Sequence, residues 1–491
     1  MSLVAEKHGV RGKILISFIA ILTTLGVGLV AQAGMIVKLA LKAPPDGVSA
    51  LSIRPEPAKP DSGLESGGES RFSTPIPPIG AAAGWKYLPA VDLYIVDDTG
   101  KDLLNTLQKN GGVEAAEESS DIQLEALPDD PMFDDQGWTG GMGLDIGASS
   151  AWDITTGDAD VTVAIIDTGI AVNHRDLAPN LWTNDGEIPG NGRDDDGNGF
   201  EDDVHGYNFW NGNPDVTDRN NHGSHLAGII GGVGDNGIGI AGVGWRTRLM
   251  ALRFTDENGN GSSSKAIEAI DYAIRNGAQI INASWTLKLD GGPGPKTDGL
   301  MGQAIRKASE AGILFVTASG NQFETGVGLN IDDSPVYPSS LELGNIVSVT
   351  ALDAFGRLAD YANYGAASVD LAAPGSYIYS TAADGSYLAM TGTSIATAVV
   401  SGAAALVLSA RHDLTAEQLK AVLENSVVLD DSLTGKVTSG GGLNLYNSVQ
   451  LAQSGSLPES SPSSAPRKPV EAPLASQGLN IPSSGGCSLV R

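Results

Sequence analysis

The amino-acid sequence predicts an α/β fold: a doubly wound, mainly parallel sheet, preceded by a small α+β unit. Between about residues 128 and 453, short apolar runs alternate with segments of helical spacing. This order predicts a parallel sheet covered on both faces, because each helix returns the chain to the edge where the next strand starts. The chain has 491 residues, of which 41% are hydrophobic, so it can bury a sizeable core.

Local patterns place the strands and helices of this region. A β-branched run over residues 161–166 predicts a strand that ends at Asp167. Further strands alternate with helical segments that a glycine follows, and glycine commonly ends a helix in the left-handed conformation. The other predicted elements are a helix at 266–275 ending at Gly277, a strand from Ile280, a helix at 303–310 ending at Gly312, a strand at 313–316 and a helix that starts with the capping box Thr415–Gln418.

Residues 85–127 predict the small α+β unit that precedes the large region. A strand is expected at 91–96, a helix at 101–109, and a second strand near Ile122 and Leu124. A unit of this size buries little apolar surface by itself. We therefore expect it to depend on another part of the chain.

The N-terminal segment has the composition of a targeting sequence. Basic residues precede an apolar run over residues 14–30, and Ala31-Gln32-Ala33 offers a site for signal peptidase. Residues 1–33 are therefore predicted to be a signal peptide, with an uncleaved membrane anchor as the alternative. Either predicts a secreted or extracytoplasmic protein, in the periplasm or at the cell surface. Membrane contact is expected only through this segment, if it stays uncleaved.

Two further segments are rich in Pro, Ser and Gly. Residues 34–84 are predicted to be a linker, and residues 454–491 a disordered tail. The tail holds Cys487, the one cysteine of the chain, so no intramolecular disulfide can form. The formal net charge of -28 argues against a nucleic-acid partner, because a phosphate backbone would be repelled.

Four side chains in the large region could carry chemistry. Asp167 follows a strand, where ligands gather in parallel sheets, although a structural turn would explain it equally well. Ser394 opens a long apolar helix and Asn321 lies in a loop after a strand; helix capping and turn stabilisation are their alternatives. His222 lies three residues before His225. That spacing allows either a metal pair or a catalytic base with an unrelated neighbour.

Three short blocks resemble the subtilisin-like serine proteases (subtilases). They stand in the order Asp, His, Ser, which is the chain order of that family. Supporting matches span about residues 128–452. The three blocks are 165-IIDTGI-170, 222-HGSHLAG-228 and 392-GTSIATA-398, and the matches around them include 146-IGASSAWDITTG-157, 281-INASW-285, 318-ASGN-321 and 369-VDLAAPG-375.

The resemblance implies a subtilisin-like catalytic domain at 128–453 and a role for each of the four side chains. Ser394 would attack the scissile carbonyl, and His222 would take its proton and pass it to the leaving amine. Asp167 would orient the imidazole and stabilise the imidazolium. The side chain of Asn321 and the backbone N–H of Ser394 would hold the oxyanion.

The family resemblance also implies how partners bind. A polypeptide substrate would lie as an extended strand against two segments of the enzyme. The unit at 85–127 is similar to the subtilase pro-domain, an intramolecular inhibitor that is removed by self-cleavage, here expected near residues 124–130. The substrate-binding residues implied are Gly259, Gly261, Ser284, Trp285, Thr286, Ser319 and Gly320.

Calcium is the cofactor that the sequence predicts. Within the acidic loop 187–203, alternate oxygen-bearing residues before Gly199 match the first half of an EF-hand loop, but position twelve is His205 where Glu is required. A solvated acidic loop is the alternative. The candidate ligands are Asp194, Asp196, Asn198 and Asp202.

A second calcium site is implied by the resemblance alone. Its ligands would be the side chains of Asp176 and Asn236 and the carbonyl oxygens of Ile238 and Ile240. Zinc at His222 and His225 is disfavoured, because a Glu partner and a third ligand are missing at sensible spacing.

The chain departs from the family pattern beside the nucleophile. Ile395 stands where Met is common, so better tolerance of peroxide is expected. Ser224 and Thr286 also differ from the usual residues, as do Ala398 and Val399, but none of these supplies a catalytic atom. The sequence thus predicts an exported, self-processed and calcium-stabilised serine endopeptidase. A catalytically silent, peptide-binding protein of the same fold is the alternative.

Overall fold

The structure is a computed structural model of the whole chain, and it divides into two units. The first covers residues 1–124 and the second residues 125–491. The predicted signal peptide lies outside the residues that the structure describes. Those residues are 35–39, 85–88, 93–96, 113–118, 127–140, 144–287, 294, 297–455, 457–458 and 488–489.

The described residues of the first unit form a four-stranded antiparallel sheet in the order β2-β3-β1-β4. The expected strand at 91–96 is present as β3. The predicted helix at 101–109 and the strand near Ile122 lie outside the described residues. The four strands are β1 (Met35–Leu39), β2 (Trp85–Leu88), β3 (Leu93–Val96) and β4 (Val113–Glu118).

One prediction for this unit was wrong at residues 35–39, and one strand was not predicted. Residues 34–84 were expected to be a linker, yet Met35–Leu39 is an inner strand that pairs with both β3 and β4. Its apolar residues lie only a few positions after the apolar N-terminal run, so in the sequence they extend that run. The strand β4 was missed because three of its six residues are glutamates. The small unit therefore begins about fifty residues earlier in the chain than the predicted start at Trp85.

In the described part of the second unit, nine strands form a sheet in the order β14-β15-β11-β10-β9-β8-β5-β7-β6. All neighbours are parallel except β14 and β15. The predicted α/β class is therefore confirmed. The strands are β5 (Thr162–Asp167), β6 (Gly206–Asn208), β7 (Arg248–Arg253), β8 (Ile280–Ala283), β9 (Leu314–Ala318), β10 (Ile346–Leu352), β11 (Leu371–Pro374), β14 (Val428–Leu429) and β15 (Gly441–Gly442).

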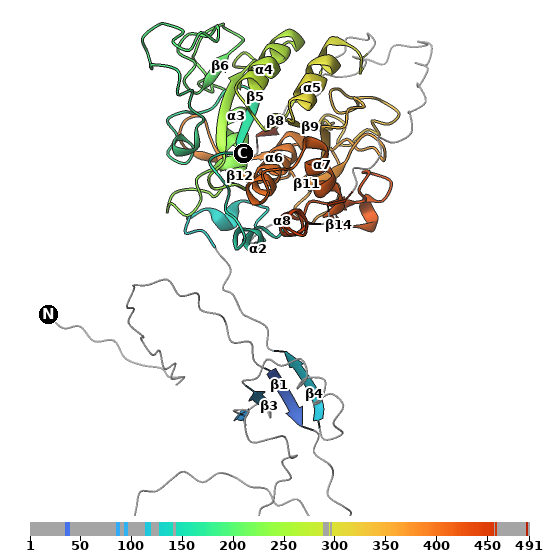
Figure 1. Cartoon of the computed structure of the whole chain (residues 1–491). Coiled ribbons are helices and arrows are strands. Elements are labelled where there is room, and N and C mark those ends of the chain that lie inside the picture. The colour runs from blue at the N-terminus through green and yellow to red at the C-terminus, as the bar shows by residue number, and fades with distance from the viewer. Residues whose placement is uncertain are drawn as a thin grey trace, which may run out of the picture. The chain divides into compact units, whose positions relative to one another are not determined.

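Helices cover both faces of this sheet (Figure 1). The helices α4 and α5 pack together on one face, and α6 packs on the other, against β8 to β11. The helix bounds are α2 (Ala148–Trp152), α3 (His222–Gly231), α4 (Ser263–Arg275), α5 (Leu300–Glu310), α6 (Thr393–Ala410), α7 (Ala416–Asn425) and α8 (Leu445–Gln453).

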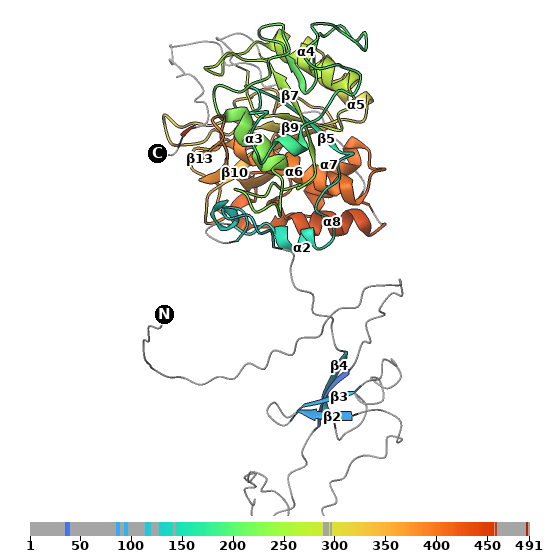
Figure 2. The same cartoon turned by 90° about the vertical axis from the view of Figure 1, so that its left-hand side faces the viewer.

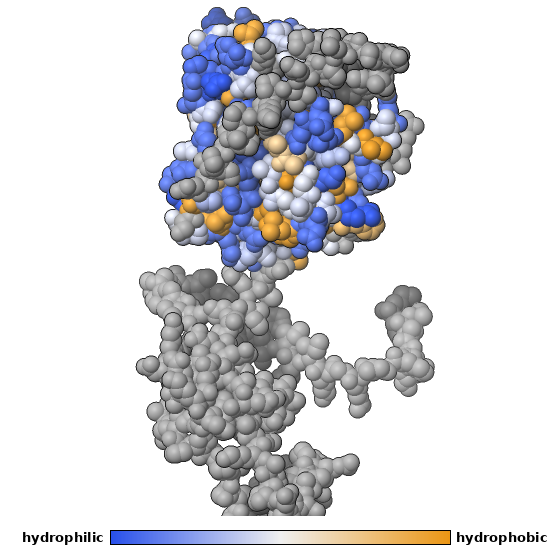
Figure 3. Space-filling model, turned by 90° about the vertical axis from the view of Figure 1, so that its right-hand side faces the viewer, coloured by the Kyte–Doolittle hydropathy of each residue, from blue (hydrophilic) through white to orange (hydrophobic). Residues whose placement is uncertain are grey.

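The alternation of side chains along β5 separates two apolar cores. Val163 and Ile165 join the core under α3 and α6, whereas Ala164 and Ile166 join the core under α4 and α5. Both sets are buried, which explains the continuous β-branched run in the sequence. On the face shown in Figure 3, apolar side chains form separate small patches among hydrophilic ones.

The ends of the helices follow the predicted chemistry. Gly277 and Gly312 both have positive φ, at 69° and 80°, just after α4 and α5. Thr415 accepts from the backbone N–H of Gln418 at the start of α7, and the capping box is complete. Among the described residues, α6 is the one helix long and apolar enough to cross a membrane. Its buried position identifies it as the central helix of the core.

A second, smaller sheet lies beside α3. Among the described residues it has three strands in the order β12-β13-β16, with all neighbours antiparallel. They are β12 (Ile378–Thr381), β13 (Tyr387–Thr391) and β16 (Ser488–Leu489). The tail at 454–491 was predicted to be disordered; at Ser488–Leu489 that prediction was wrong, because these residues pair with β13. The rest of the tail lies almost wholly outside the described residues.

Candidate active site

Three adjacent parallel strands bring candidate residues to one edge of the large sheet. The strand β8 lies between β5 and β9. Asp167 is the last residue of β5, Ser284 follows β8, and Asn321 lies in the loop after β9. Because parallel strands all end at the same edge, residues distant in the sequence meet there.

Asp167 and His222 are hydrogen bonded. The Nδ1 atom of His222 lies 2.8 Å from Oδ1 of Asp167, and the two side chains are 15% and 4% exposed. A carboxylate only accepts, so Nδ1 carries the proton and the neutral ring keeps its lone pair on Nε2. The backbone N–H of Thr168 donates to the same carboxylate oxygen. The Asp therefore fixes both the orientation and the tautomer of the imidazole.

A second buried carboxylate, that of Asp218, fixes the start of α3. Its oxygens accept from the Thr168 hydroxyl, from the backbone N–H and hydroxyl of Ser224, and from the backbone N–H of Asn220. These groups include an N–H of the first helical turn, which has no partner within the helix. Asp218 thereby joins the loop after β5 to the helix that carries His222. Asp218 was not predicted from the sequence.

The end of β5 and the start of α3 are in direct backbone contact. A Cβ atom on Gly223 would lie 2.1 Å from the carbonyl oxygen of Gly169. Gly169 itself has φ of 111°, and a Cβ there would lie 2.4 Å from the carbonyl oxygen of Val216. Larger residues would force the two elements apart. Gly169 follows Thr168, whose backbone N–H bonds Asp167, and Gly223 directly follows His222.

Ser394 lies in the first turn of α6. Its hydroxyl is buried and has no hydrogen-bond partner among the described residues. Its carbonyl oxygen accepts from the hydroxyl of Ser284 at 2.9 Å, and Ser284 in turn accepts from the amide of Asn282 at 3.0 Å. The backbone that carries Ser394 is therefore anchored to the end of β8.

The side-chain amide of Asn321 has a defined orientation. Its Oδ1 atom accepts from the backbone N–H of Thr393 at 2.9 Å, which directs the Nδ2 donor away from that bond. The Thr393 hydroxyl also accepts from the backbone N–H of Gly320 at 3.1 Å. Both bonds tie the loop after β9 to the residue that precedes Ser394.

Comparison with known proteins shows the family to which the chain belongs. The family model of the subtilases (Peptidase_S8, subtilase family) matches residues 158–453, a span that holds Asp167, His222, Asn321 and Ser394. The chain belongs to the subtilase family. Members of this family are serine endopeptidases, and the α/β fold of the second unit is the fold that the family match implies.

Curated relatives include proteases from bacteria and from Plasmodium. The chain is 33% identical to a thermophilic serine proteinase of Bacillus sp. (strain AK1), over 71% of this chain and 75% of that one. It is 33% identical to thermitase of Thermoactinomyces vulgaris, over 66% of this chain and 99% of that protein. It is 35% identical to subtilisin-like protease 1 of Plasmodium berghei, over 61% of this chain. There the match spans about half of the relative, 51% of its length.

The structure places the predicted substrate residues of this subtilase around the same edge. Gly259 and Gly261 lie in an exposed turn, and the carbonyl oxygen of Glu257 in that turn accepts from the Asn220 side chain. The Trp285 indole donates to the carbonyl oxygen of Ile166. Thr286 follows Trp285 and is half-buried.

Ser319 and Gly320 are held by a residue that the sequence analysis did not single out. The amide of Asn363 donates to the carbonyl oxygen of Ser319, and the Ser319 hydroxyl donates to the carbonyl oxygen of Asn363. The Asn363 backbone N–H donates to the carbonyl oxygen of Gly320. The carbonyl groups of this segment are thus engaged within the protein.

The second histidine of the subtilase α3 helix has a separate environment. His225 is fully buried, and its Nε2 atom lies 3.0 Å and 3.2 Å from the carbonyl oxygens of Ile378 and Leu388. Burial lowers the pKa of His225 to about 3, so the ring is neutral and Nε2 is the donor. His225 therefore anchors the β12–β13 hairpin.

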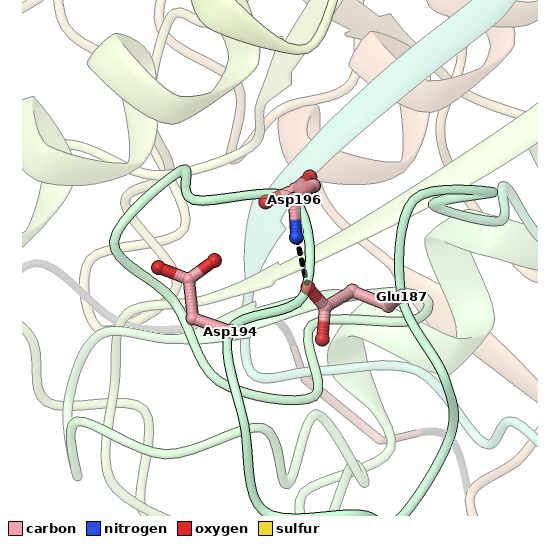
Figure 4. A group of neighbouring side chains, drawn as sticks. All are labelled: Glu187, Asp194 and Asp196. Carbon is pink, nitrogen blue, oxygen red and sulfur yellow. Dashed lines mark hydrogen bonds between the residues drawn. The ribbon is translucent and has the colours of Figure 1, made fainter.

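The acidic loop gathers three carboxylates, one of which was not predicted. Ligand oxygens of Glu187, Asp194 and Asp196 lie within 4.8 Å of one another (Figure 4). Asn198 lies beside them and donates to Asp196 and Asp203. The predicted ligand Asp202 is not in this group; its carboxylate accepts from the backbone N–H groups of Asn191 and Gly192. Asp202 has φ of 53°, and this turn directs its side chain elsewhere.

The residues of the predicted second calcium site are brought together around Asp176, which is fully buried. Its oxygens accept from the Asn236 amide at 2.9 Å and from the backbone N–H of Ile240 at 3.0 Å. Asn236 also accepts from the backbone N–H of Ile238 at 2.7 Å. The hydroxyl of Tyr387, the first residue of β13, donates to Asp176 at 2.8 Å.

Asp130 adds a carboxylate to this second group that the sequence analysis missed. It is buried, and its Oδ1 atom has no hydrogen-bond partner among the described residues. Burial, with the charges of Asp176 and Asp129, raises the pKa of Asp130. An uncompensated buried carboxylate oxygen close to a second carboxylate fits a cation site.

Proposed function

We propose that this subtilase is an exported endopeptidase that hydrolyses peptide bonds through Asp167, His222 and Ser394. The observation that carries the proposal is the 2.8 Å bond between His222 and Asp167, because it leaves the basic nitrogen of the imidazole as Nε2. A neutral imidazole in this tautomer can accept the proton of a serine hydroxyl. The buried and unpartnered hydroxyl of Ser394 is the group that requires such a base.

In the acylation step, a bond forms between the Ser394 oxygen and the scissile carbonyl carbon, while the hydroxyl proton moves to His222. The buried Asp167 carboxylate stabilises the imidazolium that results. The tetrahedral oxyanion is bound by the Nδ2 donor of Asn321 and the backbone N–H of Ser394, which lies in the free first turn of α6. The carbon–nitrogen bond then breaks, and His222 gives its proton to the leaving amine. Water hydrolyses the acyl-enzyme by the same route.

Labelling with a fluorophosphonate tests this proposal directly. The wild-type chain should be labelled at Ser394, and Ser394→Ala should not be labelled. Asp167→Asn keeps the side-chain volume but favours the wrong tautomer, so labelling should slow by roughly 10³–10⁴-fold. Wild-type protein that folds but does not react would support the alternative, a silent subtilase-fold protein that binds peptides.

We further propose that calcium stabilises the folded chain. In the loop of Figure 4, Glu187, Asp194 and Asp196 would hold the ion, with Asn198 nearby. At the second position, Asp176, Asp130 and Asn236 supply the side-chain oxygens, and Ile238 and Ile240 their carbonyl oxygens. A bound cation would neutralise carboxylates that otherwise repel one another in the folded state.

We also propose that the first unit is the inhibitory pro-domain of the subtilase, cut off by Ser394 near residues 124–130. The division of the chain after Leu124 falls within that range. The N-terminal segment at 1–33 would direct export. N-terminal sequencing of the purified wild-type and Ser394→Ala proteins tests both steps: only the wild-type chain should begin near residues 124–130, and neither should retain residues 1–33.

A further inference from the structure

The C-terminal residues of the chain lie on a strand next to the nucleophile. The strand β13 has β12 on one edge and β16 on the other. In the second pairing, Thr391 is opposite Ser488 and Met390 is opposite Leu489. Figure 2 shows the red C-terminal segment beside β13. Thr391 precedes Ser394 by three residues.

The chain direction of β16 matches the direction expected for the leaving-group half of a bound peptide. Because β13 and β16 are antiparallel, Ser488 lies opposite the residue nearer to Ser394 and Leu489 opposite the residue further away. A chain followed from its N-terminal to its C-terminal end along β16 therefore moves away from the nucleophile. The amine half of a cleaved peptide also runs away from the scissile bond in this direction.

The hairpin that binds β16 is attached to the helix of the base. The hydroxyls of Ser380 and Thr381 on β12 donate to the carbonyl oxygens of His225 and Ser224 in α3. That helix begins with His222, which must pass its proton to the leaving amine. Asn321, which would bind the oxyanion of the acyl half, lies instead in the loop after β9. The edge of β13 that pairs with β16 is thus placed on the leaving-group side.

We propose that the C-terminal segment of this chain, at Ser488–Leu489, pairs with the edge of β13 as a tethered competitor of the leaving-group half of peptide substrates. The proposal rests on the protease function proposed above. Strand addition takes its affinity from main-chain hydrogen bonds. The tail and a substrate would use the same main-chain groups of β13, so only one of them can bind at a time. A tether raises the local concentration of the tail into the millimolar range.

Removal of residues 484–491 tests the competition. For peptides that extend at least three residues beyond the scissile bond, KM should fall roughly 3- to 10-fold, with kcat unchanged. For a chromogenic substrate whose leaving group is a single aromatic amine, the change in KM should be smaller. The free octapeptide SGGCSLVR, added to the shortened chain with a reducing agent, should restore the higher KM competitively. An unchanged KM for the extended peptides would overturn the proposal.

Two substitutions separate strand pairing from mere length. Ser488→Pro with Leu489→Pro removes the backbone donors of β16 and should reproduce the effect of removal. A matched control, Ser463→Pro with Ser464→Pro, places two prolines earlier in the same tail and should leave KM unchanged. An identical effect of both pairs would show that the tail acts without pairing and would contradict the proposal.

Direct binding distinguishes this proposal from the protease function. Fluorescently labelled SGGCSLVR should bind the shortened chain that also carries Ser394→Ala, as measured by anisotropy, and the same peptide with Leu489→Pro should bind at least tenfold more weakly. This measurement needs no catalysis. Binding without hydrolysis by the wild-type chain would overturn the protease function alone, whereas hydrolysis without binding would overturn the tethered strand alone.

Discussion

The hydroxyl of Ser284 donates to the carbonyl oxygen of Ser394 at 2.9 Å. Ser284 follows β8, and Ser394 is in the first turn of α6. The bond therefore joins the sheet to the helix that carries the proposed nucleophile, and both residues are buried. In this subtilase, Ser284 acts on the position of Ser394 and need not touch the substrate.

Replacement of this hydroxyl should impair turnover more than binding. In Ser284→Ala, the carbonyl oxygen of Ser394 loses its donor, and a small displacement of the nucleophile can cost up to about 10²-fold in rate. We expect kcat to fall about 10-fold with little change in KM. Ser401→Ala is the matched control, because Ser401 also bonds the network at Asn282 but lies two turns further along α6. Equal losses of kcat in both variants would contradict a positioning role.

Asp218 should be essential to the placement of His222. An amide in Asp218→Asn accepts at one oxygen only, so buried donors at the start of α3 would lose their partner, at about 1–3 kcal/mol for each. We expect chemical denaturation to show a loss of roughly 2–4 kcal/mol, with slower fluorophosphonate labelling. The control Asp215→Asn removes an exposed carboxylate paired with Arg219 and should cost less than about 1 kcal/mol.

The stability of the fold should depend on pH through Glu424. Burial and the charge of Asp370 raise the pKa of this carboxyl from 4.5 to about 8. The folded state therefore keeps a proton that the unfolded state has lost, and stability should decrease as pH rises from about 4.5 to 8. Glu424→Gln mimics the protonated form. It should match the wild type near pH 4 and exceed it by at least about 1 kcal/mol at pH 9.

Denaturation at several pH values checks this prediction. Glu310→Gln is the control, because Glu310 is an exposed residue of α5 that pairs with Lys307. Its stability difference from the wild type should not vary between pH 5 and pH 9. A constant difference for Glu424→Gln as well would contradict the assignment.

Removal of calcium should lower the thermal midpoint of unfolding. An ion at 100 times its dissociation constant stabilises the folded state by about 2.7 kcal/mol. We expect excess EGTA to lower the midpoint of the wild type. Asp130→Asn should weaken the response at the Asp176 position, and Glu187→Gln the response at the acidic loop. No shift with EGTA would exclude stabilising calcium, and two unaffected variants would exclude these two positions.

Resistance to peroxide should depend on Ile395. This side chain is fully buried beside Ser394 and contains no sulfur. In Ile395→Met, oxidation to the sulfoxide would place a polar group next to the nucleophile. The variant should lose activity in peroxide several times faster than the wild type, measured as residual hydrolysis over time. Leu408→Met, in the last turns of the same helix, serves as the control and should resemble the wild type.

Much of the fold follows from the order of apolar runs and caps. The strand β5, the helices α4, α5 and α7 and their end signals are local features, since a few residues determine each. The strand β1 was mistaken for linker because its pairing partners, β3 and β4, lie far along the chain. The strand β16 was not predicted for the same reason, because Ser488 and Leu489 form a strand only by pairing with the edge of β13.

In the candidate site as well, locally determined features were predicted and features that depend on tertiary packing were not. The three blocks around Asp167, His222 and Ser394 stand out because each combines a reactive side chain with a strand or helix end. No local sequence pattern distinguishes Asp218 and Asp130, since an acidic residue in a loop is most often solvated. Their buried positions arise from tertiary packing. Glu187 was overlooked because it precedes the Asp-rich run and joins Asp194 only when the loop folds back.

The hydrogen bond from Tyr387 to Asp176 has a consequence for where the enzyme can work. Tyr387 begins β13, and Asp176 belongs to the proposed ion site, so one hydroxyl connects ion binding to the strand beside the nucleophile. Loss of the ion would change the carboxylate to which Tyr387 donates, and with it the position of β13. The proteolytic activity would then be low where the calcium concentration is low and higher where calcium is plentiful. The hydrogen bond would thereby make activity depend on the calcium concentration of the compartment.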